Sequence, residues 1–120
     1  FLGHIDLVSK FNEGGRCFDE ADPRYLRPAL EAAECAVRRG LPIEINTGAI
    51  ARGHRTAPYP NPAILRHIHD LGGKIIINSD AHAVEHIDCA FPQAVALAKA
   101  CGFKTVLRLR SFGFEEIPLD

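Results

Sequence analysis

The feature that most constrains the fold is a regular alternation of strand-like and helix-like segments along the chain. Apolar segments with strand character lie at residues 1–7, 41–45, 74–78 and 104–109, and longer segments with helical period separate them. The run Ile75-Ile76-Ile77 is continuously apolar and β-branched, which is typical of a parallel strand buried on both faces. The order βαβαβαβ predicts an α/β fold with about four parallel strands and three intervening helices.

The three helical segments carry recognisable start and stop signals. Each begins at a residue whose side chain can cap a helix, followed by proline in the first two cases, at Asp22, Asn61 and Asp88. A glycine follows the last periodic residue of each, at Gly40, Gly72 and Gly102. Apolar residues on one face predict burial of Leu26, Ala29, Leu30, Ala33 and Val37, then of Ile64, Leu65, Ile68 and Leu71, and finally of Phe91, Ala94, Val95 and Ala98.

This βα alternation is compatible with an open doubly wound sheet or with part of a (β/α) barrel. The glycine-rich loops G-x-G-x-x-G and G-x-x-x-x-G-K-[ST], which would favour a nucleotide-binding sheet, are absent from the sequence. A barrel normally needs about 250 residues, so four strands would be about half of one. The chain also begins within a strand-like segment and without methionine, which favours its interpretation as a piece of a longer polypeptide. Residues 1–120 are therefore expected to form part of a single domain.

Composition and charge limit the expected partners and location. The formal net charge is −1 and charges of both signs are mixed, so we expect neither nucleic-acid nor membrane binding. No apolar run approaches the roughly 20 residues of a membrane span. The cysteines form no C-x-x-C pair and are expected to be reduced thiols of a cytoplasmic protein: Cys17, Cys35, Cys89 and Cys101. A small anionic substrate is compatible with this composition, because it needs only a local cluster of positive charge.

Polar residues near the ends of the predicted strands are candidates for a metal site. Asp80 and His82 follow a buried strand and offer one oxygen and one nitrogen, a mixture that suits Zn²⁺, Mn²⁺ or Fe²⁺ better than Ca²⁺. The alternative is that Asp80 caps a turn and His82 is an ordinary loop residue. His4 is the third candidate ligand, because a histidine inside an apolar strand is costly unless its nitrogens have partners. Asp6 is either a further ligand or, more readily, a residue that orients a ligand or caps the loop.

Positive charge after the second predicted strand is a candidate phosphate site. Arg52 and Arg55, with His54 between them, can bind phosphate through their guanidinium groups, or they can simply cover a surface loop. Lys10 and Arg16 are weaker candidates for the same role. Glu44 and Asn46 are expected to orient ligands or loop backbone rather than to bind metal. The remaining histidines are set aside: His67 and His69 lie about 200° apart around a helix, and His86 is expected to be solvated.

Three strings in the sequence resemble histidinol-phosphate phosphatases of the PHP (polymerase and histidinol phosphatase) family. They are GHIDL at residues 3–7, EINTGAIARGHRTAPYP at 44–60 and INSDAH at 77–82, and residues 112–119 resemble the C-terminus of that family. The resemblance covers essentially the whole chain. It implies the C-terminal half of a distorted (β/α)₇ barrel that carries three metal ions at its C-terminal face, with His4, Asp80 and His82 as metal ligands. The earlier metal-binding motifs of the family, H-x-H included, lie upstream of these strings, so the missing N-terminal half of the barrel is the expected partner.

The resemblance also implies an activity, in which water or hydroxide bound between metals attacks phosphorus. The expected enzyme is a phosphatase that hydrolyses L-histidinol phosphate to L-histidinol and phosphate in histidine biosynthesis, with Asp80 and His82 as catalytic residues. Without the resemblance, the residues predict only a metal site near an anion site. Two alternatives are a phosphoesterase of the same family that acts on another phosphoester, and a barrel remnant without metal that serves as a structural or interaction module. The 120 residues by themselves are expected to be inactive.

Overall fold

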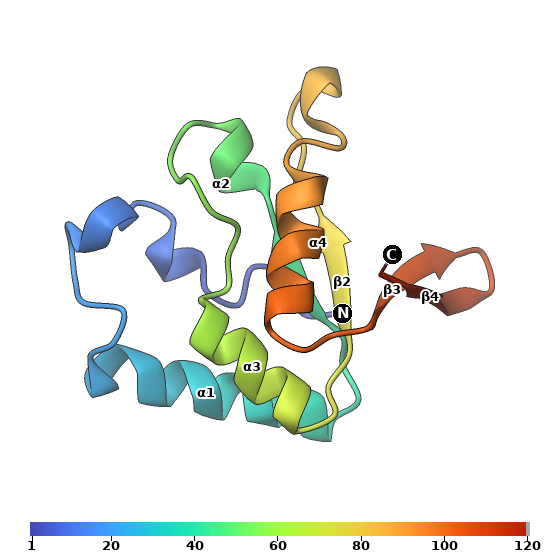
Figure 1. The fold of residues 1–120 in the computed structure, drawn as a ribbon, viewed down its shortest axis with the longest axis horizontal. Helices are drawn as coiled ribbons and strands as arrows, with labels where there is room; N and C mark the ends of the chain where they lie inside the picture. Colours follow the sequence, from blue (N-terminus) through green and yellow to red (C-terminus); the bar gives the residue numbers. More distant parts are fainter. Residues whose placement is uncertain (120) are drawn as a thin grey trace.

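A four-stranded, mostly parallel sheet organises residues 1–119, which are the residues that this computed structural model describes. Its strands are β1 (Ile43–Asn46), β2 (Ile75–Asn78), β3 (Thr105–Arg110) and β4 (Gly113–Pro118), in the spatial order β1-β2-β3-β4. β1 pairs with β2 and β2 with β3 in parallel, whereas β3 and β4 form an antiparallel hairpin. Figure 1 shows this hairpin projecting from the body of the molecule, away from the helices.

Four α-helices accompany the sheet within residues 1–119: α1 (Pro23–Arg38), α2 (Gly48–Ala51), α3 (Pro62–Asp70) and α4 (Phe91–Ala100). Single 3₁₀ turns lie at Leu7–Ser9, Glu13–Gly15 and Val84–His86. α2, which has only four residues, carries no periodic signal that the sequence could have revealed. None of the helices in this part of the chain is both long and apolar enough to cross a membrane.

Two of the three predicted helix caps are confirmed. The side chain of Asp22 accepts a hydrogen bond from the Arg24 backbone N–H, and that of Asn61 from the Ala63 N–H. The prediction for Asp88 is wrong, because α4 begins after Ala90, which has a left-handed φ of 60° and makes no side-chain cap. Asp88 contributes only its backbone carbonyl, which accepts from the Phe91 N–H.

Three of the four predicted parallel strands are confirmed as β1, β2 and β3, but the first predicted strand is wrong. Residues 1–7 form no strand: Leu2 alone pairs with Ile43 as an isolated parallel bridge, and the chain turns away at His4, whose φ is 37°. At the other end, the last strand is antiparallel and was not predicted. It follows β3 through two residues, Ser111 and Phe112, and its register is matched by ion pairs from Arg108 and Arg110 to Glu115.

The hydrophobic core lies between the sheet and helices α1, α3 and α4. Ile43, Ile45 and Ile75 of the sheet are buried, and α1 packs against α3. From the helices, the residues buried in this core are Ala33, Ala36, Ile64, Leu65, Ile68, Ala94 and Ala98. The predicted helix faces are therefore largely correct. Leu71 is an exception: it is 42% exposed because α3 ends at Asp70 and the chain turns at Gly72, whose φ is 71°. On α4, Phe91 and Val95 are only partly buried and lie outside the core, against which Leu97 packs instead.

Candidate functional site

The candidate site lies where parallel strands β1 and β2 end together. Asn46 and Asn78, the last residues of these strands, are in register, so the segments that follow leave the sheet at one edge. Ser79 and Asp80 continue from β2, while Thr47 and α2 continue from β1 and lead to Arg52. The prediction that polar residues gather at the carboxyl ends of neighbouring parallel strands is correct for this pair.

Arg52 and Asp80 form the central ion pair of this edge. The guanidinium donates from Nη1 to the Asp80 backbone carbonyl at 2.9 Å and from Nη2 to Asp80 Oδ2 at 3.0 Å. Burial alone would raise the pKa of Asp80, but the hydrogen bond and charge of Arg52 outweigh it and hold the pKa below its usual value. Gly48 makes room for this contact, because a Cβ there would lie 2.8 Å from Arg52 Nη2.

Of the two predicted histidine ligands, His82 lies next to Asp80. His82 is largely exposed, and its Nε2 is 3.5 Å from Asp80 Oδ1. His4 is close enough for its charge to contribute, last among the causes, to the lowered pKa of Asp80. The prediction that His4 lies inside an apolar strand is wrong, because this residue is exposed and outside any strand. Both His4 and Asp80 have left-handed backbone conformations, with φ of 37° and 48°, a form of strain that concentrates at functional sites.

These donors do not form a complete metal-binding set. Within residues 1–119, no group of three or more His, Cys, Asp and Glu side chains is arranged to hold an ion. Asp80 Oδ2 is already bound by Arg52, and Asp80 Oδ1 with two imidazoles supplies the oxygen and nitrogen chemistry that Zn²⁺, Mn²⁺ or Fe²⁺ prefers. The donor chemistry therefore fits a metal ion that also takes further ligands, and metal binding by His4, Asp80 and His82 stays a prediction.

Glu44 and Asn46 connect this edge through buried hydrogen bonds. Glu44 Oε2 accepts from the His4 backbone N–H at 2.8 Å and from Asn46 Nδ2 at 3.0 Å, and Glu44 Oε1 accepts from Asn78 Nδ2 at 2.8 Å. Asn46 Oδ1 accepts from the Gly48 N–H at the start of α2. A buried carboxylate with three donors thus fixes the turn at His4 to the ends of β1 and β2.

Asp6 belongs to a different part of the molecule. Its carboxylate accepts from the Tyr25 hydroxyl and from the Asn61 N–H, each at 2.9 Å, which fastens the N-terminal segment to α1 and to the start of α3. Burial raises the pKa of Asp6, and these hydrogen bonds offset the effect only in part. Burial and the Asp6 charge likewise raise the pKa of Tyr25.

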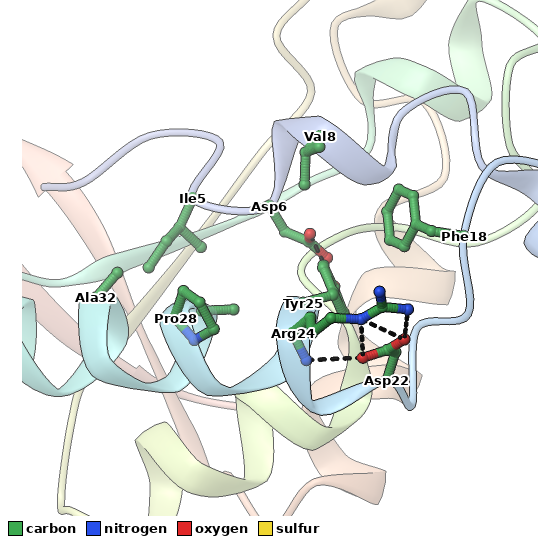
Figure 2. A pocket seen from close by; sticks show the side chains of 10 residues that line it. Ile5, Asp6, Val8, Phe18, Asp22, Arg24, Tyr25, Pro28 and Ala32 are labelled. Atoms are coloured by element: carbon green, nitrogen blue, oxygen red, sulfur yellow. Dashed lines mark hydrogen bonds and ion pairs between the residues drawn. The ribbon is translucent and has the colours of Figure 1, made fainter.

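The Asp6 carboxylate lines an open groove of about 610 Å³ between the N-terminal segment and α1 (Figure 2). Apolar side chains such as Ile5, Val8 and Phe18 form most of the groove, and the charged pair Asp22 and Arg24 lies at one end. Asp6 is the one predicted site residue among its lining residues. The groove is therefore separate from the edge at which Asp80 lies.

Arg55 is engaged away from Asp80. Its Nη1 donates to the Ser9 carbonyl at 3.0 Å and lies 3.3 Å from Glu20 Oε1, and its Nε is 3.9 Å from Glu13 Oε2. Among the weaker candidates, His54 packs edge-on against the Phe11 ring, Lys10 lies over the same ring, Arg16 is exposed, and His86 is partly buried in its 3₁₀ turn. Arg52 therefore contacts the predicted ligand Asp80, whereas Arg55 and the four weaker candidates do not.

Comparison with known proteins gives one informative match. No protein-family model matches the chain. A protein of Deinococcus radiodurans named as a probable histidinol-phosphatase is 30% identical to it over 105 residues. The matched region covers 88% of this chain, and the chain spans 37% of the length of that protein. The chain is thus similar to part of a protein whose name describes a phosphatase.

Sequence reasoning missed Tyr59, which lies at the same edge as Asp80. Its backbone pairs with that of Asn46 in an antiparallel bridge, and its side chain is fully buried. A tyrosine in a loop gives no metal-ligand or phosphate signal, so it was not selected; the proline-rich run from Pro58 to Pro60 was the available hint that this loop is ordered. Chemically, the edge combines the Arg52 guanidinium, a group that can bind an anion, with the Asp80 carboxylate and the His82 imidazole.

Proposed function

We propose that this chain is the C-terminal part of a metal-dependent, PHP-family phosphatase that hydrolyses L-histidinol phosphate to L-histidinol and phosphate in histidine biosynthesis. The observation that carries the proposal is the 30% identity over 105 residues to the probable histidinol-phosphatase of Deinococcus radiodurans. The contacts of His82 and Arg52 with Asp80 agree with it. Four free thiols agree with a cytoplasmic location.

The proposal includes the architecture, in which residues 1–120 contribute about half of a distorted (β/α)₇ barrel. Parallel pairing of β1 with β2 and of β2 with β3 supports this, as does the parallel bridge from Leu2 to β1. The antiparallel β4 would then be an addition at the end of the parallel series. The rest of the barrel would supply the further metal ligands.

In the proposed site, His4, Asp80 and His82 hold metal ions and Arg52 binds the phosphoryl group. A bound divalent metal would supply Lewis-acid stabilisation of the phosphoryl charge and would activate water. Arg52 is better placed for phosphate than Arg55, because its partner Asp80 belongs to the site, whereas Arg55 is held by Glu20 and the Ser9 carbonyl. A phosphate that binds the Arg52 guanidinium therefore competes with Asp80 for it.

The test is phosphate release from histidinol phosphate and from a panel of other phosphate monoesters, with the protein made at its full natural length and its metal content measured in parallel. Asp80→Ala and His82→Ala should lower kcat by orders of magnitude and reduce bound metal. Arg52→Ala should raise KM more than it lowers kcat. His69→Gln, a change on α3, is the matched histidine control. Full activity with normal metal content in both Asp80→Ala and His82→Ala would contradict the proposal.

One observation favours a second candidate, a barrel remnant without metal. Both proposed phosphate-binding arginines are engaged by acidic residues of the chain itself, Arg52 by Asp80 and Arg55 by Glu20 and Glu13. A protein in which these pairs are permanent would bind neither metal nor phosphate and would serve as a structural or interaction module. Metal analysis of the full-length protein separates this candidate from the phosphatase. The substrate panel separates a histidinol phosphatase from a phosphoesterase that acts on another ester.

A further inference from the structure

The hydroxyl of Tyr59 is a buried polar group that residues 1–119 leave without a hydrogen-bond partner. The Tyr59 side chain has no exposed surface, and its neighbours provide no acceptor or donor for the hydroxyl. Buried hydroxyls in proteins are nearly always bonded, since an unpaired one opposes folding. An unpaired hydroxyl next to a candidate site therefore calls for a functional explanation.

Backbone geometry places Tyr59 on the face of the sheet that carries the candidate site. Asn46 and Tyr59 exchange both backbone hydrogen bonds, Asn46 N–H to Tyr59 O at 2.8 Å and Tyr59 N–H to Asn46 O at 3.2 Å. Directly paired residues in a sheet present their side chains on the same face, and residues two apart in a strand do so as well. The Tyr59 ring therefore shares a face with Asn46 and Glu44.

Charges around the hydroxyl agree with this placement. Burial raises the pKa of Tyr59, and the charges of Asp80, Glu44 and Asp6 raise it further while that of Arg52 opposes them. Among the four, Asp80 has the strongest influence. The placement itself rests on the backbone pairing of Tyr59 with Asn46, whose strand ends at the same edge of the sheet as the strand that leads to Asp80.

Of the three carboxylates, Asp80 has the free capacity to accept a hydrogen bond. Both oxygens of Glu44 already accept, from the His4 N–H and from two asparagine amides. Both oxygens of Asp6 accept too, from Tyr25 and Asn61. Among the described residues, Asp80 Oδ1 has only His82 at 3.5 Å, and Asp80 Oδ2 depends on Arg52.

We propose that Tyr59 is a positioning residue whose hydroxyl donates a hydrogen bond to the Asp80 carboxylate when a bound phosphate group draws the Arg52 guanidinium away from it. The inference rests on the proposed function, because it takes phosphate as the ligand of Arg52. Asp80 is partly buried, and departure of Arg52 would leave its Oδ2 without a donor, which is costly; the unpaired hydroxyl of Tyr59 can replace that donor. Tyr59 thereby makes the transfer of Arg52 from Asp80 to phosphate less unfavourable.

The first experiment needs no ligand and uses a double-mutant cycle on the full-length protein. Tyr59→Phe alone should leave the melting temperature unchanged or raise it, because it removes an unpaired group. In an Arg52→Ala background, where Asp80 has lost its donor, Tyr59→Phe should lower the melting temperature. Tyr25→Phe is the stability control, since its hydroxyl is already bonded to Asp6 and its loss should destabilise the protein in either background. Equal effects of Tyr59→Phe in the two backgrounds would overturn the proposal.

The second experiment measures binding of inorganic phosphate, followed by the rise in melting temperature and by competition with histidinol phosphate. Tyr59→Phe should weaken phosphate binding about 10- to 100-fold, the loss expected for one hydrogen bond to a charged group. Unchanged phosphate affinity in Tyr59→Phe overturns the inference even if the wild-type protein is an active phosphatase. If the wild-type protein hydrolyses no phosphate monoester, the proposed function fails, while the double-mutant cycle still decides whether Tyr59 supports Asp80.

Discussion

Asp6 and Asp80 are carboxylates whose pKa values the fold shifts in opposite directions. Burial raises that of Asp6, because the hydrogen bonds from Asn61 and Tyr25 do not fully compensate the loss of solvent. Burial acts on Asp80 as well, but there the charge and hydrogen bond of Arg52 prevail and the pKa is lowered. The difference lies in the partner: neutral donors for Asp6 and a guanidinium for Asp80.

These shifts predict opposite pH dependences of stability. Because the folded pKa of Asp80 is lowered, its contribution is fully present above the ordinary value of 3.8 and is lost as pH falls through the folded pKa. Because the folded pKa of Asp6 is raised, stability falls as pH rises from 3.8 through the folded pKa. The measurement is the free energy of unfolding against pH for the full-length wild type, Asp80→Asn and Asp6→Asn. The difference in free energy of unfolding between the wild type and Asp80→Asn should decrease towards low pH. The difference between the wild type and Asp6→Asn should decrease towards high pH. If the curves of unfolding free energy against pH run parallel for the wild type and both variants, the assigned pKa shifts of Asp80 and Asp6 are contradicted.

The sequence could identify some of the residues at this edge but not how their hydrogen-bonding groups are used. Asp80 and Arg52 were selected because parallel strands bring their carboxyl ends to one edge, and this is where they lie. Arg52 binds both the carbonyl and the carboxylate of Asp80. This contact depends on the four-residue helix α2 and on the space next to Gly48, which has no side chain. Contacts between residues 28 positions apart that depend on such local geometry leave no periodic trace in a sequence.

At the level of helices and strands, local signals succeeded where neighbouring residues determine the structure. Proline after a capping side chain fixed the starts of α1 and α3, and three β-branched residues fixed β2. The failure at residues 1–7 has a long-range cause, because the Glu44 carboxylate binds the His4 N–H forty positions away and stabilises a left-handed turn there. The β4 strand was missed because it has no continuous apolar run; it pairs with β3 through apolar pairs such as Val106 with Ile117 and through ion pairs to Glu115.

The helix α3 offers a test of how its end determines packing. Ile68 is fully buried, whereas Leu71, three residues later, follows the last helical residue and is 42% exposed. Ile68→Ala should therefore lower the free energy of unfolding by about 2–5 kcal/mol, because it removes buried methyl groups and leaves a cavity. Leu71→Ala should cost less than about 1 kcal/mol. Urea denaturation of the full-length protein measures both, and similar losses for the two variants would show that Leu71 is buried by residues outside 1–119.

Across the whole molecule, burial of the sheet decreases from β1 to β4. All four residues of β1 are buried, whereas β3 is exposed from Arg108 onward, where the hairpin leaves the body of the molecule (Figure 1). Two sets of large apolar side chains are exposed at opposite ends of the chain, Phe1, Leu7, Val8 and Phe11 in the N-terminal segment and Leu109, Phe112 and Phe114 in the hairpin. Exposed apolar groups of this extent, together with a free strand edge at β4, favour association.

The last prediction concerns the 120-residue polypeptide made alone. It should self-associate or aggregate, because its apolar groove, its two apolar clusters and its β4 edge are open to solvent. We expect the rest of the proposed barrel to cover the groove beside Val8, because the lining of the groove is mostly apolar. Val8→Ser should therefore reduce association of the isolated polypeptide but lower the stability of the full-length protein.

Phe112→Ser is the matched comparison for Val8→Ser, since Phe112 is 78% exposed at the tip of the hairpin. It should reduce association of the isolated polypeptide and leave the stability of the full-length protein nearly unchanged, because surface substitutions usually have small effects. Sedimentation velocity and thermal melting of both lengths give the two quantities. If the isolated polypeptide is a monodisperse monomer that melts cooperatively, its exposed surfaces do not need the rest of a barrel, and this result would contradict the prediction.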